Sequence, residues 1–468
     1  MVVISIILGV TFQALLLRRQ HAQEDHTPVS SLDALRPQPR HVGRVVNPMT
    51  TKNQTKQTLM PWSFPWVPPR TTKTGNQKQK PLNILVLYPD DWRHDAIGGV
   101  LPVVQTPFLN QLATHGIRFT HNCVTTSICW VSRATYFTGQ YGSRHESLRL
   151  MTPRFYRRWA KSDLSWPAMI QRHKNYIVSH VGKWQYANSQ RAIQFFNWTS
   201  IFEGSHWHSR EDGTTVHATD HAKDQAIRFL QERSRDHPFV MTVAFFPPKA
   251  RDNTNVTDIQ WSPKPEYMSL YQNQVIPEPY NMDDSWKKLP WFFHDYNNIG
   301  RLRWYDRFYG KDKYQKGMKN YYRLITQVDD ACKEIVQELD SQGLLQDTMI
   351  IFTTDNGYFH GEHGLAGKWY PYQESIRVPL IIYDPRMPLS KRNTLEDSFT
   401  LNIDLATTIL GAAGITTPHP EMQGRDIADL YLPPNPSITT VANYLKCRSN
   451  LTIKSFKSLS CLIALSIM

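Results

Sequence analysis

The strongest constraint on the fold is a short apolar run at residues 83–88, Asn-Ile-Leu-Val-Leu-Tyr, which is soon followed by two adjacent aspartates. A near-continuous apolar run of this length is typical of a strand that a parallel sheet buries on both faces. Asp90 and Asp91 stand where this strand stops, and burying both carboxylates is costly unless a cation neutralises them. Because α/β sheets place ligands at the carboxyl ends of their strands, the pair predicts a metal site. An exposed acidic turn is the alternative interpretation.

Three later apolar stretches repeat this pattern and indicate an α/β fold. Residues 176–184, 239–246 and 348–354 are each predicted to contain a buried strand that ends in a polar or proline-rich turn. The first places Lys183 at a strand's carboxyl end, where a solvated lysine is the alternative interpretation. The last leads into Asp-Asn-Gly at 355–357, which offers oxygen ligands of the kind that hard cations take. At 468 residues the chain is long enough for one large α/β domain with a smaller appendage.

Two helices are predicted from their boundary residues and periodicity. Residues 106–116 form the first, with Thr106 as N-cap, Pro107 at the first helical position and Gly116 as the stop. Residues 320–343 form the second, because apolar residues recur there at helical spacing until a glycine closes the pattern.

A cysteine-containing stretch at residues 123–139 carries the most specific chemical pattern. Cys129, Ser132 and Arg133 stand at i, i+3 and i+4, so a helix that begins near Cys129 places all three on one face of its first turn. A helix N-terminus favours an anion such as sulfate or phosphate, and Arg133 adds a bidentate fork. A buried structural cysteine beside a chance Ser-Arg pair is the alternative interpretation.

The chain resembles the sulfatase family in the order and spacing of several short motifs. Cys-x-x-Ser-Arg, with Thr-Gly six residues after the serine, is similar to the sulfatase signature. The family's order also holds for Asp-Asp at 90–91, Gly-Lys-Trp at 182–184, Asp-Asn-Gly at 355–357 and Gly-Lys-Trp at 367–369. The resemblance runs from about Leu82 to Leu430. It implies an alkaline-phosphatase-like α/β fold, with a large mostly parallel sheet flanked by helices and a C-terminal subdomain that is shortened or missing.

The resemblance implies a sulfuric ester hydrolase that removes sulfate from a sulfated glycan. In that family a formylglycine-generating enzyme oxidises the signature cysteine, here Cys129, and the aldehyde is hydrated to a gem-diol bound to a divalent cation. One hydroxyl attacks sulfur, and the other later loses its proton, so that the aldehyde re-forms and sulfate is expelled. By resemblance the cation is Ca²⁺, held by Asp90, Asp91, Asp355, Asn356 and modified Cys129, with the sulfate bound by Arg133, Lys183 and Lys368. Carboxylates gathered without partners would repel one another, so folding is predicted to depend on calcium.

Three departures from the family pattern support a second interpretation. Val131 stands where the signature carries proline or alanine, a position that the modifying enzyme reads. Gln185 and Lys249 stand where the family commonly has histidines, and both are predicted to contact the substrate. A lysine still binds an anion as a point charge, but glutamine is no proton donor near neutral pH. The alternative function is therefore a catalytically silent sulfatase-like protein that binds sulfated polysaccharide.

Net charge and the leader point to the secretory pathway and to a polyanionic partner. The net charge is +13, and nine basic but no acidic residues fall between positions 34 and 89, so most of the excess lies before the core. Five cysteines in a chain of this length are too few for a disulfide framework. Four Asn-x-Thr triplets fit a glycoprotein in an extracellular or lysosomal lumen. No nucleic-acid partner is expected. The oligomeric state stays open. The predicted segments are a signal peptide or anchor (1–19), a basic stem (20–80), the catalytic domain (81–432) and a divergent tail (433–468).

Overall fold

The computed structural model describes residues 63–65, 67–68, 81–148, 164–173, 175–185, 193–202, 204–251, 260–282, 284–294 and 298–433. All of these except residue 63 fall in one unit, which begins at Phe64. The predicted leader, most of the predicted stem and all but the first residue of the predicted tail lie outside the described residues. Within the described ranges, no helix has both the length and the apolar character that crossing a membrane requires.

A mixed, mostly parallel sheet of eight strands forms the centre of this unit. β12 runs antiparallel to both of its neighbours, and every other pair of adjacent strands is parallel. Across the sheet the order is β13 (Thr394–Glu396), β2 (Ile117–Phe119), β12 (Leu380–Tyr383), β9 (Thr348–Thr353), β1 (Asn83–Leu87), β8 (Phe239–Ala244), β4 (Ile177–Gly182) and β5 (Trp198–Ile201).

The four predicted strands stand side by side at the centre of the sheet, in the order β9, β1, β8, β4. Every residue of β1, β8 and β9 is buried, as their near-continuous apolar sequences predict. The predicted α/β class with a mostly parallel sheet is therefore confirmed. Because these four strands are parallel, their carboxyl ends meet at one edge, and the loops that follow them converge there.

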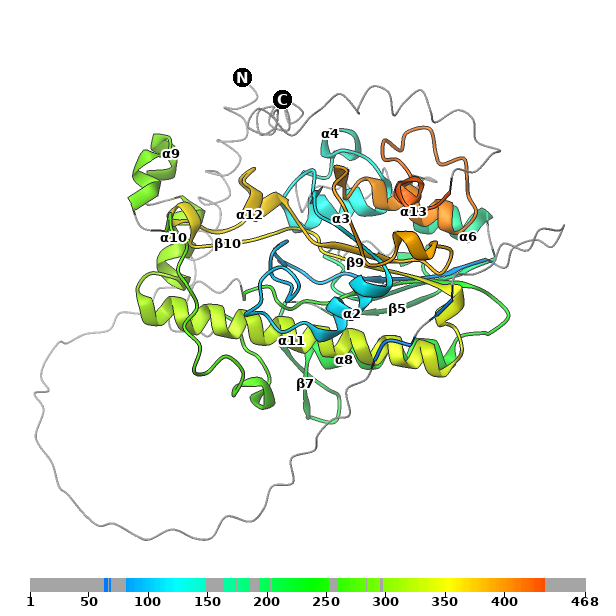
Figure 1. Ribbon diagram of the computed structural model, residues 1–468, viewed down its shortest axis with the longest axis horizontal. Helices are drawn as coiled ribbons and strands as arrows, with labels where there is room; N and C mark the ends of the chain where they lie inside the picture. Colours follow the sequence, from blue (N-terminus) through cyan, green and yellow to red (C-terminus); the bar gives the residue numbers. More distant parts are fainter. Residues whose placement is uncertain are drawn as a thin grey trace, which may run out of the picture. The chain divides into compact units, whose positions relative to one another are not determined.

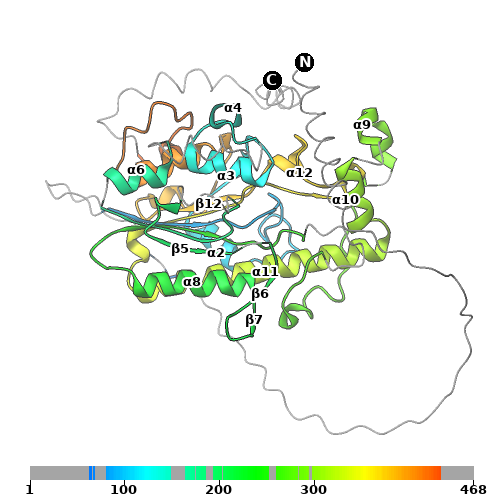
Figure 2. The ribbon, with the colours of Figure 1, turned by 180° about the vertical axis from the view of Figure 1, so that it is seen from behind.

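Helices cover both faces of the sheet (Figures 1 and 2). The long helix α11 packs against α8 and α2 on one face, and α3, α6 and α13 pack together on the other. The helices are α2 (Pro107–His115), α3 (Cys129–Thr138), α4 (Gly142–His145), α6 (Trp166–His173), α8 (Ala218–Glu232), α9 (Trp291–His294), α10 (Ile299–Arg307), α11 (Lys311–Ser341), α12 (Gln373–Ile376) and α13 (Asp404–Ala412).

Several short strands and turns complete the unit. Three pairs of short strands are β3 (Asn122–Cys123) with β14 (Thr400–Leu401), β6 (Trp207–Ser209) with β7 (Thr215–His217), and β10 (Phe359–His360) with β11 (Ala366–Gly367). Short 3-10 turns lie at Pro265–Tyr267, Asp284–Lys288, Leu345–Asp347, Glu362–Gly364, Leu389–Lys391 and Ile427–Leu430.

α2 confirms the first predicted helix, but its two ends are stabilised in unpredicted ways. The side chain of Thr106 makes no capping bond. Instead, Asp329 of α11 accepts the backbone N–H groups of Phe108 and Leu109, both at 2.9 Å. Gly116 has an extended backbone rather than a left-handed one. It is needed for close approach, because a Cβ there would lie 2.2 Å from the carbonyl oxygen of Ile382.

α11 confirms the second predicted helix but begins nine residues earlier than predicted, at Lys311 rather than residue 320. The added turns bury Tyr314, Gly317 and Met318 in an aromatic cluster. A Cβ on Gly317 would lie 3.2 Å from a ring atom of Trp261, a tight contact that favours a small residue there. The added turns form against tertiary neighbours, which explains why local periodicity did not reveal them.

Part of the predicted stem packs on the globular unit. Phe64 and Val67 are buried, and the ring centroid of Phe64 lies 5.3 Å from that of Tyr383. Gln111 Oε1 accepts the backbone N–H of Phe64 at 2.8 Å. The folded unit therefore starts before residue 81, where the catalytic domain was predicted to begin.

Candidate active site

The carboxyl ends of the four central strands gather most of the predicted site residues. All of these side chains are buried at the same edge of the sheet. They are Asp90 and Asp91 after β1, Lys183 after β4, Lys249 after β8, and Asp355 and Asn356 after β9. This convergence follows from the parallel strand order, which brings together loops that are far apart in the sequence.

α3 supplies the residues of the cysteine motif. Cys129 is the first residue of this helix, as predicted for a helix that begins near it, and Cys129, Ser132 and Arg133 are all buried. Ser132 Oγ accepts a hydrogen bond from Asn402 Nδ2 at 2.8 Å, which ties α3 to the segment before α13. Cys129 therefore sits at the helix N-terminus, where unpaired N–H groups and the helix dipole favour negative charge.

Each carboxylate of the cluster is paired with a basic side chain. Lys183 Nζ pairs with Asp90 Oδ2, and Lys368 Nζ pairs with Asp91 Oδ1. Two nitrogens of Arg133, Nε and Nη2, contact Asp355 Oδ2 at 2.9 Å each. Basic side chains therefore balance the negative charge of the three carboxylates. Their mutual repulsion gives no reason for folding to depend on calcium in this structure.

Two further lysine contacts give the cluster an excess of positive charge. Lys249 Nζ lies 3.9 Å from Asp91 Oδ2, and Lys368 Nζ also lies 2.5 Å from Cys129 Sγ. Four basic side chains thus stand around three carboxylates within a buried volume. Such a balance favours a bound anion, because low solvent access strengthens each charge interaction.

Burial and charge together set the protonation of two site residues. Burial alone would raise the pKa of Asp355, but the charges of Arg133, Lys183 and Lys368 lower it below its ordinary value. Burial raises the pKa of the Cys129 thiol, and the Lys368 charge only partly opposes this effect. The unmodified thiol is therefore protonated at neutral pH and a weak nucleophile.

The residues fit a hard divalent cation. Ligand atoms of Asp90, Asp91 and Cys129 lie within 4.8 Å of one another. Asp90 Oδ1, Asp91 Oδ2 and Asn356 Oδ1 are buried and accept no hydrogen bond from the described residues. Buried oxygens without donors are costly unless a cation takes their lone pairs, and an all-oxygen set suits Ca²⁺ or Mg²⁺. The donor chemistry is thus compatible with the predicted metal site.

The two residues at the family's histidine positions differ in their placement. Lys249 is buried and faces the cluster through Asp91. Gln185 lies two residues after Lys183, is only partly buried and has a left-handed backbone with φ of 70°. A contact of Gln185 with substrate stays a prediction.

Residues near the cluster that the sequence did not single out hold the loop after β1. Tyr321 Oη of α11 donates to the backbone oxygen of Asp91 at 3.0 Å, and the backbone N–H of Arg93 donates to the same hydroxyl at 3.2 Å. The Arg93 side chain pairs with Glu362. The Gly-Glu-His-Gly run around Glu362 resembles the family, yet its sequence gave no sign of this pairing, which joins segments 269 residues apart.

Comparison with known proteins identifies the family. Residues 83–415 match the family model described as Sulfatase. The chain belongs to the sulfatase family. This assignment confirms both the predicted family and the predicted enzyme class, and the segment matched includes every predicted metal ligand and sulfate-binding residue.

Named relatives are moderately similar to this sulfatase-family chain. It is 26% identical over 422 residues to the N-acetylglucosamine-6-O-sulfatase of Bacteroides thetaiotaomicron, a match that covers 75% of this chain and 71% of that protein. It is 24% identical over 373 residues to the human N-acetylglucosamine-6-sulfatase, covering 74% of this chain and 63% of the human protein. The chain therefore spans somewhat less than two thirds of the human relative.

A solved structure confirms the fold. It is described as a complex with its substrate D-glucosamine-2-N,6-O-disulfate, and it aligns with a TM-score of 0.60 at 25% identity. The alignment covers 74% of this chain and 79% of that one. The alkaline-phosphatase-like architecture predicted from the motifs is thus confirmed over most of the described unit.

Proposed function

We propose that this chain hydrolyses sulfate esters on a glycan, with formylglycine at position 129 as the nucleophile and a divalent cation, Ca²⁺, beside it. One observation carries the proposal: Cys129 Sγ lies at a helix N-terminus, 2.5 Å from Lys368 Nζ, and groups with Asp90 and Asp91, each of which has a buried oxygen that accepts no hydrogen bond from the described residues. This arrangement joins the signature cysteine to a cation-type ligand set and to an anion-type ring of basic side chains.

The cation would be held by Asp90, Asp91, Asp355, Asn356 and residue 129. When bound, it would supply Lewis-acid polarisation of the sulfate ester, and formylglycine would supply a hydroxyl nucleophile in place of the thiol. Burial of the site excludes water and strengthens the charges that face the reacting group.

The basic side chains have distinct proposed tasks. Lys368 contacts both Asp91 and Cys129, so it would stabilise negative charge that develops at residue 129. Arg133 and Lys183 pair with Asp355 and Asp90 and hold these carboxylates in place, and they would also bind sulfate oxygens. Lys249 would reach the sulfate as a point charge, since it already faces Asp91.

The proposed substrate is a sulfated glycan that contains glucosamine. Two of the relatives are named N-acetylglucosamine-6-sulfatases, and the aligned structure holds a sulfated glucosamine. A polyanionic glycan also suits the excess of basic residues in the site and in the stem. Such substrates occur in the secretory pathway and outside the cell, which is the proposed location.

A catalytically silent protein that binds sulfated polysaccharide is the second candidate. Val131 is fully buried in the first turn of α3, at the signature position that usually carries proline or alanine. Gln185 cannot act as a proton donor near neutral pH, and Lys249 stands where the family has an imidazole. These three positions favour binding without turnover.

Peptide mass and sulfate release test the first candidate against the second. The mass of the tryptic peptide that holds residue 129 gives the formylglycine fraction, and sulfate release from an aryl sulfate and from N-acetylglucosamine-6-sulfate gives the activity. We expect activity in proportion to the converted fraction, abolished by Cys129→Ala and retained by Cys332→Ala, a matched change at a buried cysteine of α11. Full activity of Cys129→Ala would contradict the mechanism, and full conversion without release from any sulfated glycan would favour the binding protein.

A further inference from the structure

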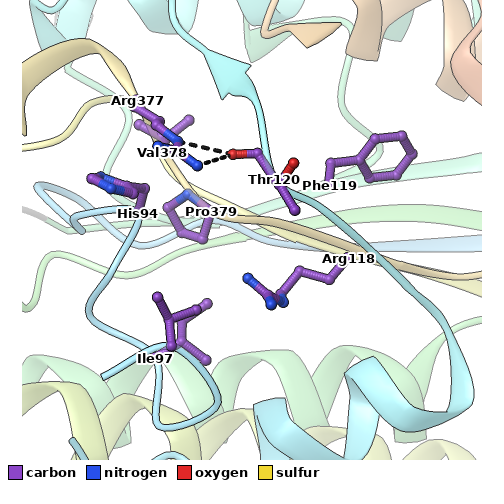
Figure 3. A pocket seen from close by; sticks show the side chains of 9 residues that line it. His94, Ile97, Arg118, Phe119, Thr120, Arg377, Val378 and Pro379 are labelled. Carbon is purple, nitrogen blue, oxygen red and sulfur yellow. Dashed lines mark hydrogen bonds between the residues drawn. The ribbon is translucent and has the colours of Figure 1, made fainter. Parts of the chain in front are cut away.

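A small cavity lies near the ends of β2 and β12, at the edge of the sheet where the candidate active site also lies (Figure 3). It has a volume of about 30 Å³ and is lined by residues from three segments, 94–100, 118–120 and 377–379. Thr353 Oγ1 donates to the carbonyl oxygen of Pro379 at 2.8 Å, so one wall is fixed to the strand that leads to Asp355. The cavity and the candidate site therefore share the carboxyl edge of the sheet.

Two arginines face this cavity. Arg377 donates from Nε to the carbonyl oxygen of Thr120 at 2.8 Å, and this bond orients its guanidinium (Figure 3). The side chain of Arg118 also lines the cavity, and within the described residues it makes no hydrogen bond or ion pair. Burial and the charge of Arg377 lower the pKa of Arg118. Two guanidinium groups that line one cavity, with no carboxylate among its described lining residues, favour a bound anion.

None of the described residues that line the cavity carries a carboxylate. Two acidic side chains next to lining residues are already engaged: Asp95 with Arg93, through bonds of 2.9 Å and 2.7 Å, and Asp397 with the Thr120 hydroxyl at 2.6 Å. His94 adds a ring nitrogen, Nδ1, that is buried and has no hydrogen-bond partner among the described residues. Burial, opposed by Asp95 and assisted by Arg377 and Arg93, lowers the pKa of His94 to about 4, so its ring is neutral and can donate one N–H.

We propose that this cavity is an oxyanion subsite, which binds a sulfate or carboxylate group on a sugar next to the one that is cleaved. A volume of about 30 Å³ admits the oxygens of one such group but no sugar ring, so the sugar itself stays outside. The subsite would select glycans with anionic groups on neighbouring sugars over isolated sulfate esters. The claim that the anion belongs to a sugar rests on the proposed function. The affinity of the cavity for an oxyanion does not depend on that function.

Binding of a heparin-derived tetrasaccharide to the full chain tests this subsite without turnover. The Cys129→Ala background keeps the ligand intact, and isothermal titration at fixed ionic strength gives the affinity. We expect Arg118→Gln to weaken binding about tenfold, as loss of one charge-assisted hydrogen bond does, and Arg118→Lys to stay within about threefold. Arg228→Gln, at an exposed arginine of α8, is the matched control and should bind like the parent. Thermal unfolding without ligand checks that each variant is folded.

Two further measurements separate this proposal from the proposed function. In the otherwise unchanged protein, Arg118→Gln should leave turnover of an aryl sulfate unchanged and raise KM for a sulfated oligosaccharide about tenfold. A parent protein with full formylglycine conversion but no activity would refute the proposed function, yet the tetrasaccharide titration would still decide the subsite. Equal tetrasaccharide affinity of the parent and Arg118→Gln overturns the subsite. If the two proteins bind the tetrasaccharide equally but only the parent binds sodium sulfate, the cavity is a site for free sulfate and not for a sugar-linked group.

Discussion

Replacing Lys368 by methionine is expected to remove most of the activity and part of the stability. Methionine keeps the length of the side chain but loses the ammonium group, which pairs with Asp91 Oδ1 and lies 2.5 Å from Cys129 Sγ. The side chain is almost fully buried, so neither water nor a surface charge can replace the lost contact. The change therefore acts on a proposed metal ligand and on the proposed nucleophile together.

The expected magnitudes follow from these contacts. Loss of one preorganised donor at a developing charge lowers kcat by about 10²-fold to 10³-fold, or about 2.7–4 kcal/mol. Breaking a buried ion pair costs about 3–5 kcal/mol of unfolding free energy. The lower end applies here, because Asp91 Oδ1 still accepts from Asn356 Nδ2 at 2.5 Å.

Two assays separate these effects. The kcat for an aryl sulfate is measured per formylglycine-containing molecule, and urea unfolding gives the stability. Lys316→Met, at an exposed position of α11, serves as the control and should change neither quantity. A folded Lys368→Met protein with an unchanged formylglycine fraction and a kcat within about threefold of the parent would refute the role assigned to Lys368.

Three further predictions concern conversion, metal and pH. Val131→Pro restores a residue of the family signature that the modifying enzyme reads, so it should raise the formylglycine fraction measured by peptide mass. The fold should tolerate the change, because position 131 lies in the first turn of α3, where a backbone N–H has no intrahelical acceptor and proline fits. An unchanged fraction would show that Val131 does not limit conversion. Calcium at 100 times its Kd should add about 2.7 kcal/mol to the free energy of unfolding. EGTA should remove this gain without unfolding the chain, because lysine and arginine side chains pair with the carboxylates. A Tm that changes with neither calcium nor EGTA would contradict the cation site. Burial raises the pKa of Asp426 to about 7, so its ionisation destabilises the fold increasingly as pH rises from about 4 to about 7. Asp426→Asn keeps the acceptor for the Ala428 N–H but cannot ionise. In urea unfolding, its free energy of unfolding relative to that of the parent should therefore increase between pH 5 and pH 8. A difference that does not change with pH would contradict the raised pKa of Asp426.

Much of the fold and of the site could be predicted from local sequence. The strands β1, β4, β8 and β9 could be predicted from their apolar runs, because a strand that is buried on both faces contains few polar residues. The spacing of Cys129 and Arg133 predicts a shared helical face because the helical period is fixed. Placing polar residues after parallel strands then predicts their convergence at one edge.

Only the tertiary structure decided which charges meet. Lys368 pairs with Asp91 across 277 residues, and Asp329 caps α2 across about 220. The early start of α11 at Lys311 and the approach of Arg118 to Arg377 likewise depend on neighbours that no local period encodes. The energy of a charge pair depends on the distance between its two side chains. Strand order sets this distance, and the packing of the whole sheet, not any single segment, fixes the strand order. The sequence therefore determined which residues reach the edge of the sheet, and the fold determined which of them are paired and which still face an open cavity.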